Sequence, residues 1–104
     1  MDANLLALRW DNHNSTFFEV LSKIRQKELY TDVTLAAGGK YFSAHKLVLS
    51  TCSDFFEEIF EKTPCKHPVI VLKDIDAQNM ESLLSYIYCG EVRLTKYLQR
   101  LIHA

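Results

Sequence analysis

The segment of residues 44–56, which reads AHKLVLSTCSDFF, contains the residue types that could do chemistry. His45 and Cys52 are the base and the nucleophile that a thiol enzyme needs, but they stand seven residues apart. On a continuous helix this spacing is a rise of about 10 Å, whereas a nucleophile and its base must lie about 2.6–3.2 Å apart. We therefore interpret Cys52 as a small core side chain and His45 as a structural histidine, and we expect no catalytic site.

A metal site is also unsupported by the spacing of the cysteines and histidines. Cys65 and His67 form the only close pair, in a loop with two prolines, and a structural zinc needs four ligands. We expect no metal and no cofactor. The odd number of cysteines, three, fits a reducing compartment better than a disulfide framework.

A third pair, Asp32 and Lys46, brackets an expected β-hairpin, so the two residues approach each other in space. Two interpretations remain open for them. They form either a desolvated acid–base pair that fixes geometry, or an exposed ion pair worth about 0–1 kcal/mol.

The length, composition and charge of the whole chain limit the kind of domain that can position these residues. Its 104 residues fit one domain over residues 1–104, and 48% apolar residues suffice for a core. Twelve basic and thirteen acidic residues are mixed along the sequence, with a net charge of -1. No basic stripe indicates direct nucleic-acid binding, no run is long enough to span a membrane, and no signal peptide opens the chain.

Apolar spacing predicts an alternation of helices and strands. Residues 5–10 predict a strand, and residues 16–29 predict an amphipathic helix that begins with a Thr16–Glu19 capping box. Residues 31–46 predict a hairpin that turns at Gly38 and Gly39. The further expected elements are two helices broken near Ser53, a strand at 68–74 buried on both faces, a helix at 77–89 between Asp76 and Gly90, a strand at 91–94 and a helix from 96. The inward residues expected in the helix at 77–89 are Met80, Leu83, Leu84, Ile87 and Tyr88.

The N-terminal elements point outward from a single chain. No turn joins residues 5–10 to a neighbouring strand, and the helix behind them carries the adjacent residues Phe17 and Phe18. An unpaired apolar strand edge is an aggregation hazard that natural proteins pair or cover. Exchange of this strand between two copies would remove the hazard and create a symmetric dimer.

Three stretches of the sequence resemble a known family: LRWDNHNSTF, YTDVTLAAGGKYFSAHKLVLSTCSDFFEEIF and SLLSYIYCGEV. They resemble the BTB/POZ domain, and LRWDNH further resembles the tramtrack-type subgroup found in arthropod transcription and chromatin-architecture factors. The resemblance implies an α/β (α+β) fold in which a helical cluster flanks a small mixed sheet. It also implies a dimer in which the first strand crosses to pair with the last short strand of the partner.

This resemblance assigns roles to two sets of residues. Asp32 and Lys46 match a charged pocket at the dimer groove, where corepressor peptides bind in some relatives. The residues implied in the dimer interface are Leu6, Leu8, Trp10, Phe17, Phe18, Leu21, Val92 and Leu94.

The implied function is organisational. The resemblance implies homodimerisation or higher multimerisation of a nuclear transcription regulator or chromatin-architecture factor, with related BTB chains and corepressor peptides as further partners. DNA binding would belong to other domains, such as zinc fingers. The family domain normally continues into further helices, whereas this chain ends at Ala104. The alternative is an adaptor for a cullin-based ubiquitin ligase, but KTPCKHP lacks the hydrophobic-x-Glu element of such adaptors.

Overall fold

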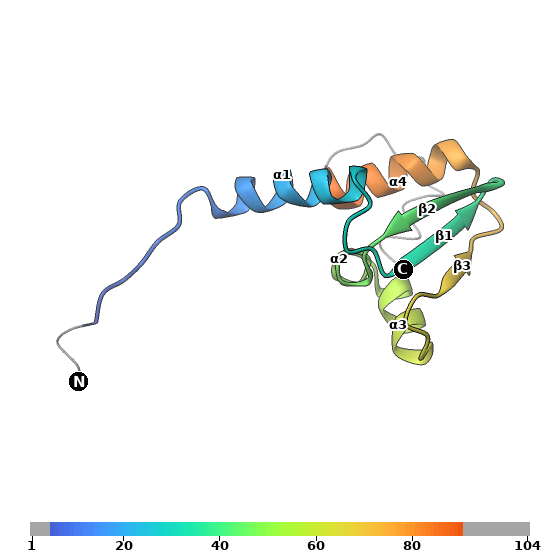
Figure 1. Cartoon of the computed structure of the whole chain (residues 1–104), viewed down its shortest axis with the longest axis horizontal. Helices are drawn as coiled ribbons and strands as arrows, with labels where there is room; N and C mark the ends of the chain where they lie inside the picture. Colours follow the sequence, from blue (N-terminus) through green and yellow to red (C-terminus); the bar gives the residue numbers. More distant parts are fainter. Residues whose placement is uncertain (1–4, 91–104) are drawn as a thin grey trace.

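The computed structural model describes residues 5–90, and it confirms an α+β architecture (Figure 1). Helices pack on one face of a small mixed sheet, and one helix extends away from the body. The elements in chain order are α1 (His13–Gln26), β1 (Val33–Ala37), β2 (Lys40–Ala44), α2 (Lys46–Cys52), α3 (Asp54–Lys62), β3 (Val69–Val71) and α4 (Ala77–Cys89).

The sheet has the strand order β2-β1-β3. β1 runs antiparallel to β2, as the expected hairpin requires, and parallel to β3. The turn between β1 and β2 consists of Gly38 and Gly39, whose φ angles of 57° and 79° lie in the left-handed region. Glycine occupies such angles without the steric penalty of a Cβ atom, so the hairpin prediction is confirmed together with its physical cause.

The core lies on one face of the sheet. Alternate residues of β1 point into it, and α4 supplies its largest share. All five residues that the sequence places on the inner side of α4 are buried, because 3.6-residue spacing aligns them on one side. The buried apolar residues are Val33, Leu35, Ala37, Ala44, Leu49, Phe56, Ile75, Met80, Leu83, Leu84, Ile87 and Tyr88.

The prediction that the third strand is buried on both faces is wrong. Val69 and Val71 are exposed, and only Ile70 is half-buried against the core. β3 is an edge strand, and within residues 5–90 helices pack on one face of the sheet only. A continuous apolar run is typical of a strand in a sheet that has helices on both faces. Within residues 5–90 this sheet has helices on one face, so the same run leaves Val69 and Val71 exposed.

Helix ends in the second half of the chain follow local chemistry. The break between α2 and α3 falls at Ser53, whose hydroxyl accepts a hydrogen bond from the Phe56 amide at 3.3 Å. The Asp76 carboxylate accepts one from the Asn79 amide at 2.7 Å and begins α4. Gly90 ends this helix with a φ of 86°. Each of these ends was predicted from the sequence.

The capping box predicted for the first helix is wrong. α1 begins at His13, so Thr16 lies inside the helix, and no side chain caps its N-terminus. Glu19 instead approaches Lys23 on the next turn, with 3.4 Å between Oε1 and Nζ. The helix also ends earlier than predicted, at Gln26, because Glu28 takes a φ of 54°. A polar run such as DNHNST holds several possible first residues, and spacing alone does not choose among them.

The predicted first strand is not a strand in the single chain. Residues 5–10 precede α1 as an extended segment, and no strand within residues 5–90 pairs with them. Strand geometry requires a second strand for its backbone hydrogen bonds. The strand and helix expected beyond Gly90, with Val92 and Leu94, lie outside the described residues. No helix within the described part of the chain has the length and apolar content to cross a membrane.

Candidate functional site: an exposed apolar arm and helix

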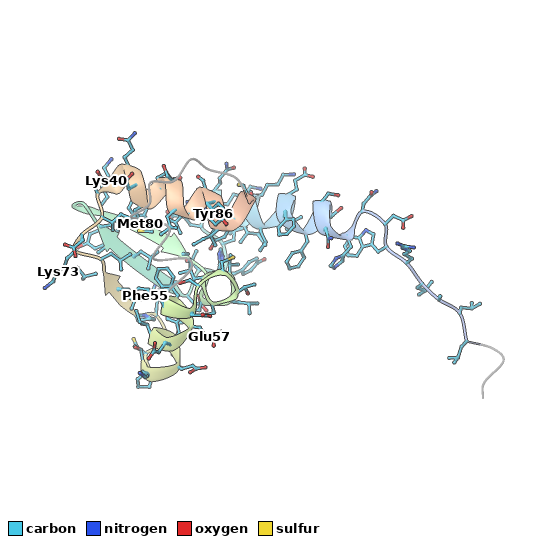
Figure 2. All side chains as sticks on the ribbon, turned by 180° about the vertical axis from the view of Figure 1, so that it is seen from behind. Lys40, Phe55, Glu57, Lys73, Met80 and Tyr86 are labelled. Atoms are coloured by element: carbon cyan, nitrogen blue, oxygen red, sulfur yellow. The ribbon has the colours of Figure 1, made fainter. Side chains whose placement is uncertain are left out.

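The N-terminal arm, defined here as residues 5–10, exposes its apolar side chains. Leu8 is 97% exposed and Leu6 is 87% exposed. Figure 2 shows the side chains of the arm and of the first turns of α1 standing clear of the rest of the molecule. Single exposed apolar residues are common, but a contiguous set of this kind marks a contact surface.

The aromatic helix face, defined here as Phe17, Phe18 and Val20, continues this surface along α1. Phe17 and Phe18 are 52% and 54% exposed. A row of rings connects the face to the arm: the centroids of Trp10 and His13 lie 4.7 Å apart, and those of His13 and Phe17 lie 5.8 Å apart. The arm and the helix therefore form one surface, and aromatic residues are enriched in the centres of protein interfaces.

The second half of α1 is attached to the body. Leu21 is half-buried against the core, so only part of the side chain of this predicted interface residue is exposed. Arg25 donates to Glu81 on α4 at 2.8 Å, and its guanidinium lies 5.4 Å from the centre of the Tyr88 ring. The Ser22 hydroxyl lies 3.2 Å from the Cys89 sulfur. These contacts hold the exposed half of α1 in a fixed direction.

Asp32 and Lys46 meet, as their positions predict, but not as an ion pair. The Asp32 carboxylate accepts a hydrogen bond from the backbone amide of Lys46 at 2.7 Å. The Lys46 ammonium is turned away and donates to the carbonyl oxygens of Cys65 and Lys66, at 2.9 and 3.2 Å. The carboxylate therefore satisfies an amide in the first turn of α2, where no intrahelical acceptor exists, and the lysine fixes the loop before β3.

His45 is a satisfied structural histidine, as expected. Its Nε2 lies 2.7 Å from the carbonyl oxygen of Leu29, so Nε2 carries the proton and donates. Its Nδ1 lies 2.7 Å from the Tyr88 hydroxyl and accepts from it, and the same hydroxyl accepts from the His45 amide at 3.0 Å. The histidine thus ties the loop after α1 to α4.

The other candidate groups do not converge on a reactive site. Burial raises the pKa of the Cys52 thiol, which disfavours the thiolate that a nucleophile requires. The His67 ring bonds to the Thr34 hydroxyl at 2.9 Å. No cluster of three or more metal-ligating side chains occurs within residues 5–90.

Sequence reasoning missed several exposed apolar residues, of which two stand out. Leu47 on α2 is 77% exposed, and Val20 extends the aromatic helix face. Apolar periodicity gave no signal for Leu47, because it stands beside Val48 and the buried Leu49 in one apolar run. Only the direction in which α2 packs exposes it.

The comparisons with known proteins agree with this architecture. The family model of the BTB/POZ domain matches residues 21–104. The chain is 43% identical to the Drosophila melanogaster protein tramtrack, alpha isoform, over 95% of its own length and 13% of that protein. It is 42% identical to the Broad-complex core protein isoforms 1/2/3/4/5 of the same organism, over 89% of its own length and 13% of the relative. The chain thus spans about an eighth of the length of these relatives.

A solved structure gives the same fold. The BTB domain of zebrafish PATZ1 aligns with a TM-score of 0.77 at 22% identity, over 94% of this chain and 80% of that one. BTB/POZ domains associate with one another and with other proteins, and theirs is not an enzymatic fold. The chain therefore belongs to the BTB/POZ domain family of protein–protein interaction modules, and its sequence places it with the tramtrack-type members.

Proposed function

We propose that this domain joins copies of its parent protein into a homodimer or a larger assembly through the N-terminal arm and the aromatic helix face. The observation that carries the proposal is the exposure of both surfaces as one apolar stretch. An extended apolar segment without a ladder partner gains both hydrogen bonds and burial from a second chain. A domain this small also gains much of its stability from a partner.

Strand exchange is the form of assembly that we propose. Leu6, Leu8 and Trp10 would alternate on one side of a strand that pairs with residues 91–94 of the partner, which include Val92 and Leu94. The arm supports this arrangement because it leaves the body at the free end of α1 (Figure 1). Phe17 and Phe18 would then pack against the symmetry-related helix, with Leu21 at the border between the interface and the core.

We also propose that the region of Asp32 and Lys46 forms a groove pocket in the dimer, open to corepressor peptides or to related BTB chains. Both side chains are half-buried and lie at the start of α2. Within residues 5–90 the Lys46 ammonium bonds only to carbonyl oxygens, so a carboxylate of a partner would be a stronger acceptor for it.

The parent protein, on this proposal, is a nuclear transcription regulator or chromatin-architecture factor of the tramtrack type. DNA binding would come from zinc fingers or other units outside these residues. Joining such units makes the second binding event intramolecular, which raises apparent affinity by about 10²–10⁴-fold without new DNA contacts. The support is the similarity to tramtrack and the Broad-complex core protein over one domain.

The proposal is tested by particle mass. We expect sedimentation and light scattering at micromolar concentration to show at least a dimer. The double change Leu8→Asp with Trp10→Asp should lower this mass, because it places two carboxylates in the exchanged strand, where burial of an unpaired charge is strongly unfavourable.

The matched control is Tyr30→Asp with Tyr41→Asp. Both tyrosines are strongly exposed, and neither belongs to the arm or to the aromatic helix face. This control should keep the mass of the wild type. A wild-type chain that stays monomeric and folded at micromolar concentration, or arm variants with unchanged mass, would remove the arm from the assembly.

A further inference from the structure

One titratable side chain, His13, lies inside the exposed apolar surface of the arm and α1. Its ring centroid is 4.7 Å from that of Trp10 in the arm and 5.8 Å from that of Phe17 on the next turn of the helix. Positions 13 and 17 share one side of α1, because residues four apart are neighbours on a helix. His13 is exposed in the single chain. A second copy that covers Trp10 and Phe17 would also cover the ring between them.

No acidic side chain within residues 5–90 pairs with His13. Its Nδ1 lies 3.3 Å from the amide oxygen of Asn14, and the first turn of α1 contains no acidic residue. The first turns of α1 stand clear of the body, so no charged group of the sheet or of the other described helices faces the ring (Figure 2). Nearby charged side chains of the arm and α1 already pair with one another: Arg9 with Asp11 at 3.5 Å, and Glu19 with Lys23 at 3.4 Å.

Burial of His13 in an assembly would disfavour its protonated form. Histidine is the side chain that changes its charge between pH 5 and 8. In the single chain water surrounds the exposed ring, whereas a second copy would remove this water, and burial of an unpaired charge is unfavourable. The contacts with Trp10 and Phe17 exist in the single chain too, so they do not offset the loss of water. The positive end of the α1 dipole opposes a positive charge at the same place.

The second copy would bring no excess of negative charge to this ring through the exchanged strand. Residues 91–94, which would pair with the arm, contain one acidic and one basic side chain, Glu91 and Arg93. The assembled state would therefore bind fewer protons than the separate chains.

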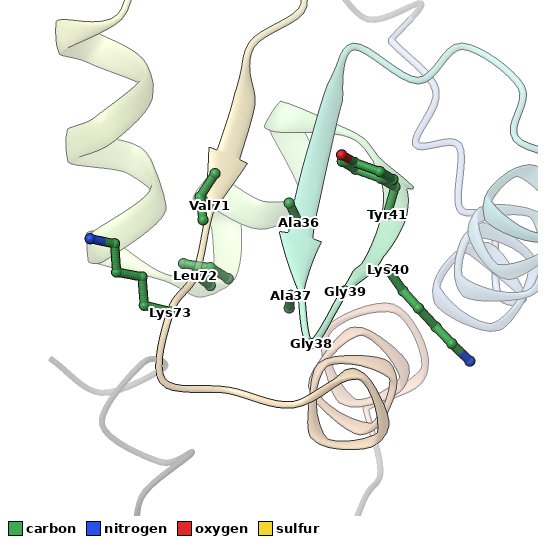
Figure 3. A pocket seen from close by; sticks show the side chains of 9 residues that line it. All are labelled: Ala36, Ala37, Gly38, Gly39, Lys40, Tyr41, Val71, Leu72 and Lys73. Atoms are coloured by element: carbon green, nitrogen blue, oxygen red, sulfur yellow. The ribbon is translucent and has the colours of Figure 1, made fainter.

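Other parts of the described chain are poor sources of such an effect. His45 and His67 lie outside the arm and the aromatic helix face, and each is hydrogen-bonded within its own chain. Another exposed surface is the sheet pocket lined by residues 36–41 and 71–73, with a volume of about 280 Å³ (Figure 3). No histidine lines this pocket, so it offers no group whose charge ordinarily changes between pH 5 and 8.

We propose that His13 makes self-association sensitive to acid: the assembly is stable while His13 is neutral and weakens as this ring gains a proton. The inference rests on the proposed function, because a second copy must cover the surface. Linkage gives the direction, since a state that binds fewer protons loses stability relative to the other as the pH falls. Each such site weakens association by up to about tenfold per pH unit, and a symmetric dimer contains two.

The test measures how fast copies exchange between assemblies. The complete 104-residue chain is mixed with the same chain enriched in heavy nitrogen, and native mass spectrometry follows the mixed assemblies at pH 8 and at pH 5.5. Exchange requires dissociation, so its rate reports on association even where the assembly is too tight for sedimentation. We expect exchange at least tenfold faster at pH 5.5. Circular dichroism at both pH values checks that the chain stays folded.

Two substitutions of His13 separate its charge from its packing. His13→Gln keeps a polar side chain of similar size that stays neutral, so exchange should be equally slow at both pH values. His13→Lys is positive throughout and should exchange at least tenfold faster than the wild type at pH 8. The matched control is His67→Gln, which removes an exposed histidine outside the surface and should keep the pH response of the wild type.

The possible failures are distinguishable. Equal exchange of the wild type at the two pH values, or the same acceleration in His13→Gln, would overturn the role of His13 and leave the assembly in place. Slower exchange at pH 5.5 would also overturn it, because the protonated ring would then have found an acidic partner in the second copy. A wild-type chain that sediments as a folded monomer at pH 8 would overturn the proposed function itself, and this inference with it.

Discussion

At the scale of single residues, the junction of His45, Tyr88 and the Leu29 carbonyl connects three parts of the chain. Each polar atom of the junction has a partner, as buried polar groups require. The Tyr88 ring is fully buried. Desolvation by burial raises the pKa of its phenol to about 12, against an ordinary value of 10. The Tyr88 hydroxyl therefore stays protonated well above physiological pH.

This pKa shift predicts an alkaline loss of stability. Above pH 10 the unfolded chain releases the Tyr88 proton, whereas the folded chain retains it up to about pH 12. The stabilisation is complete below pH 10 and is lost as the pH rises toward 12. Two pKa units correspond to about 3 kcal/mol of unfolding free energy. Urea unfolding followed by circular dichroism between pH 8 and 11.5, at fixed protein concentration, measures this loss.

Tyr88→Phe is the control for this measurement. The variant should be less stable at pH 8, by about 1–3 kcal/mol, because the amide and Nδ1 of His45 lose their partner. Its stability should depend less steeply on pH above 10. Identical slopes for the two proteins would show that another group causes the alkaline transition.

At the scale of elements, the hairpin turn is positioned by its neighbour α4. Gly38 and Gly39 both have positive φ, but their surroundings differ. A Cβ atom on Gly38 would overlap the backbone nitrogen of Ala77 at the start of α4, whereas a Cβ on Gly39 would meet nothing within 4 Å. The close approach of the hairpin turn to the start of α4 therefore requires glycine at the first of the two positions.

The two glycines allow a paired prediction. Gly39→Ala should lower the unfolding free energy by about 1–2 kcal/mol, the cost of a left-handed residue with a side chain. Gly38→Ala carries the same cost and also forces the start of α4 to move, so we expect a loss larger by at least about 1 kcal/mol. Urea denaturation of both variants at one protein concentration checks this. Equal losses of unfolding free energy in the two variants would mean that the start of α4 moves away from the added Cβ atom at no cost in stability.

At the scale of the whole molecule, the chain is more extended than its length requires. The radius of gyration is 16.5 Å, compared with about 13 Å for a compact domain of this size. The difference comes from α1 and the arm, which project from the body (Figure 1). Four contacts of Ser22, Arg25 and His45 hold the base of α1, so the projection has a defined direction.

This shape predicts where hydrogen exchange depends on protein concentration. Amides of residues 5–20 should exchange rapidly in dilute protein and become protected at micromolar concentration, as the arm and α1 pair with another copy. Amides of β1 and α4 belong to the core, so their local protection should change less. Mass spectrometry of exchanged peptides measures both regions. Equal protection of residues 5–20 at all concentrations would contradict a role in association.

The sequence by itself determined the elements whose signals are local. The pair Gly38–Gly39 specified the hairpin, Asp76 and Gly90 specified the ends of α4, and the spacing of its apolar residues specified the buried side of this helix. The caps at Ser53 and Asp76, the left-handed turn and the amphipathic face of α4 each depend on a few neighbouring residues, so they could be predicted from the sequence, whereas the polar run before α1 offered several possible caps and the predicted one was wrong. The family resemblance, also carried by short motifs, was confirmed.

Only the tertiary structure decided which surfaces remain open. β3 has an apolar sequence, yet its position at the sheet edge exposes Val69 and Val71. Asp32 and Lys46 meet, yet the competing carbonyl oxygens of the loop take the ammonium and an amide takes the carboxylate. Ala36 stands between two larger exposed residues from other strands, Tyr41 and Val71. Exposure and polar pairing depend on groups that are distant in sequence, and no local pattern encodes their packing.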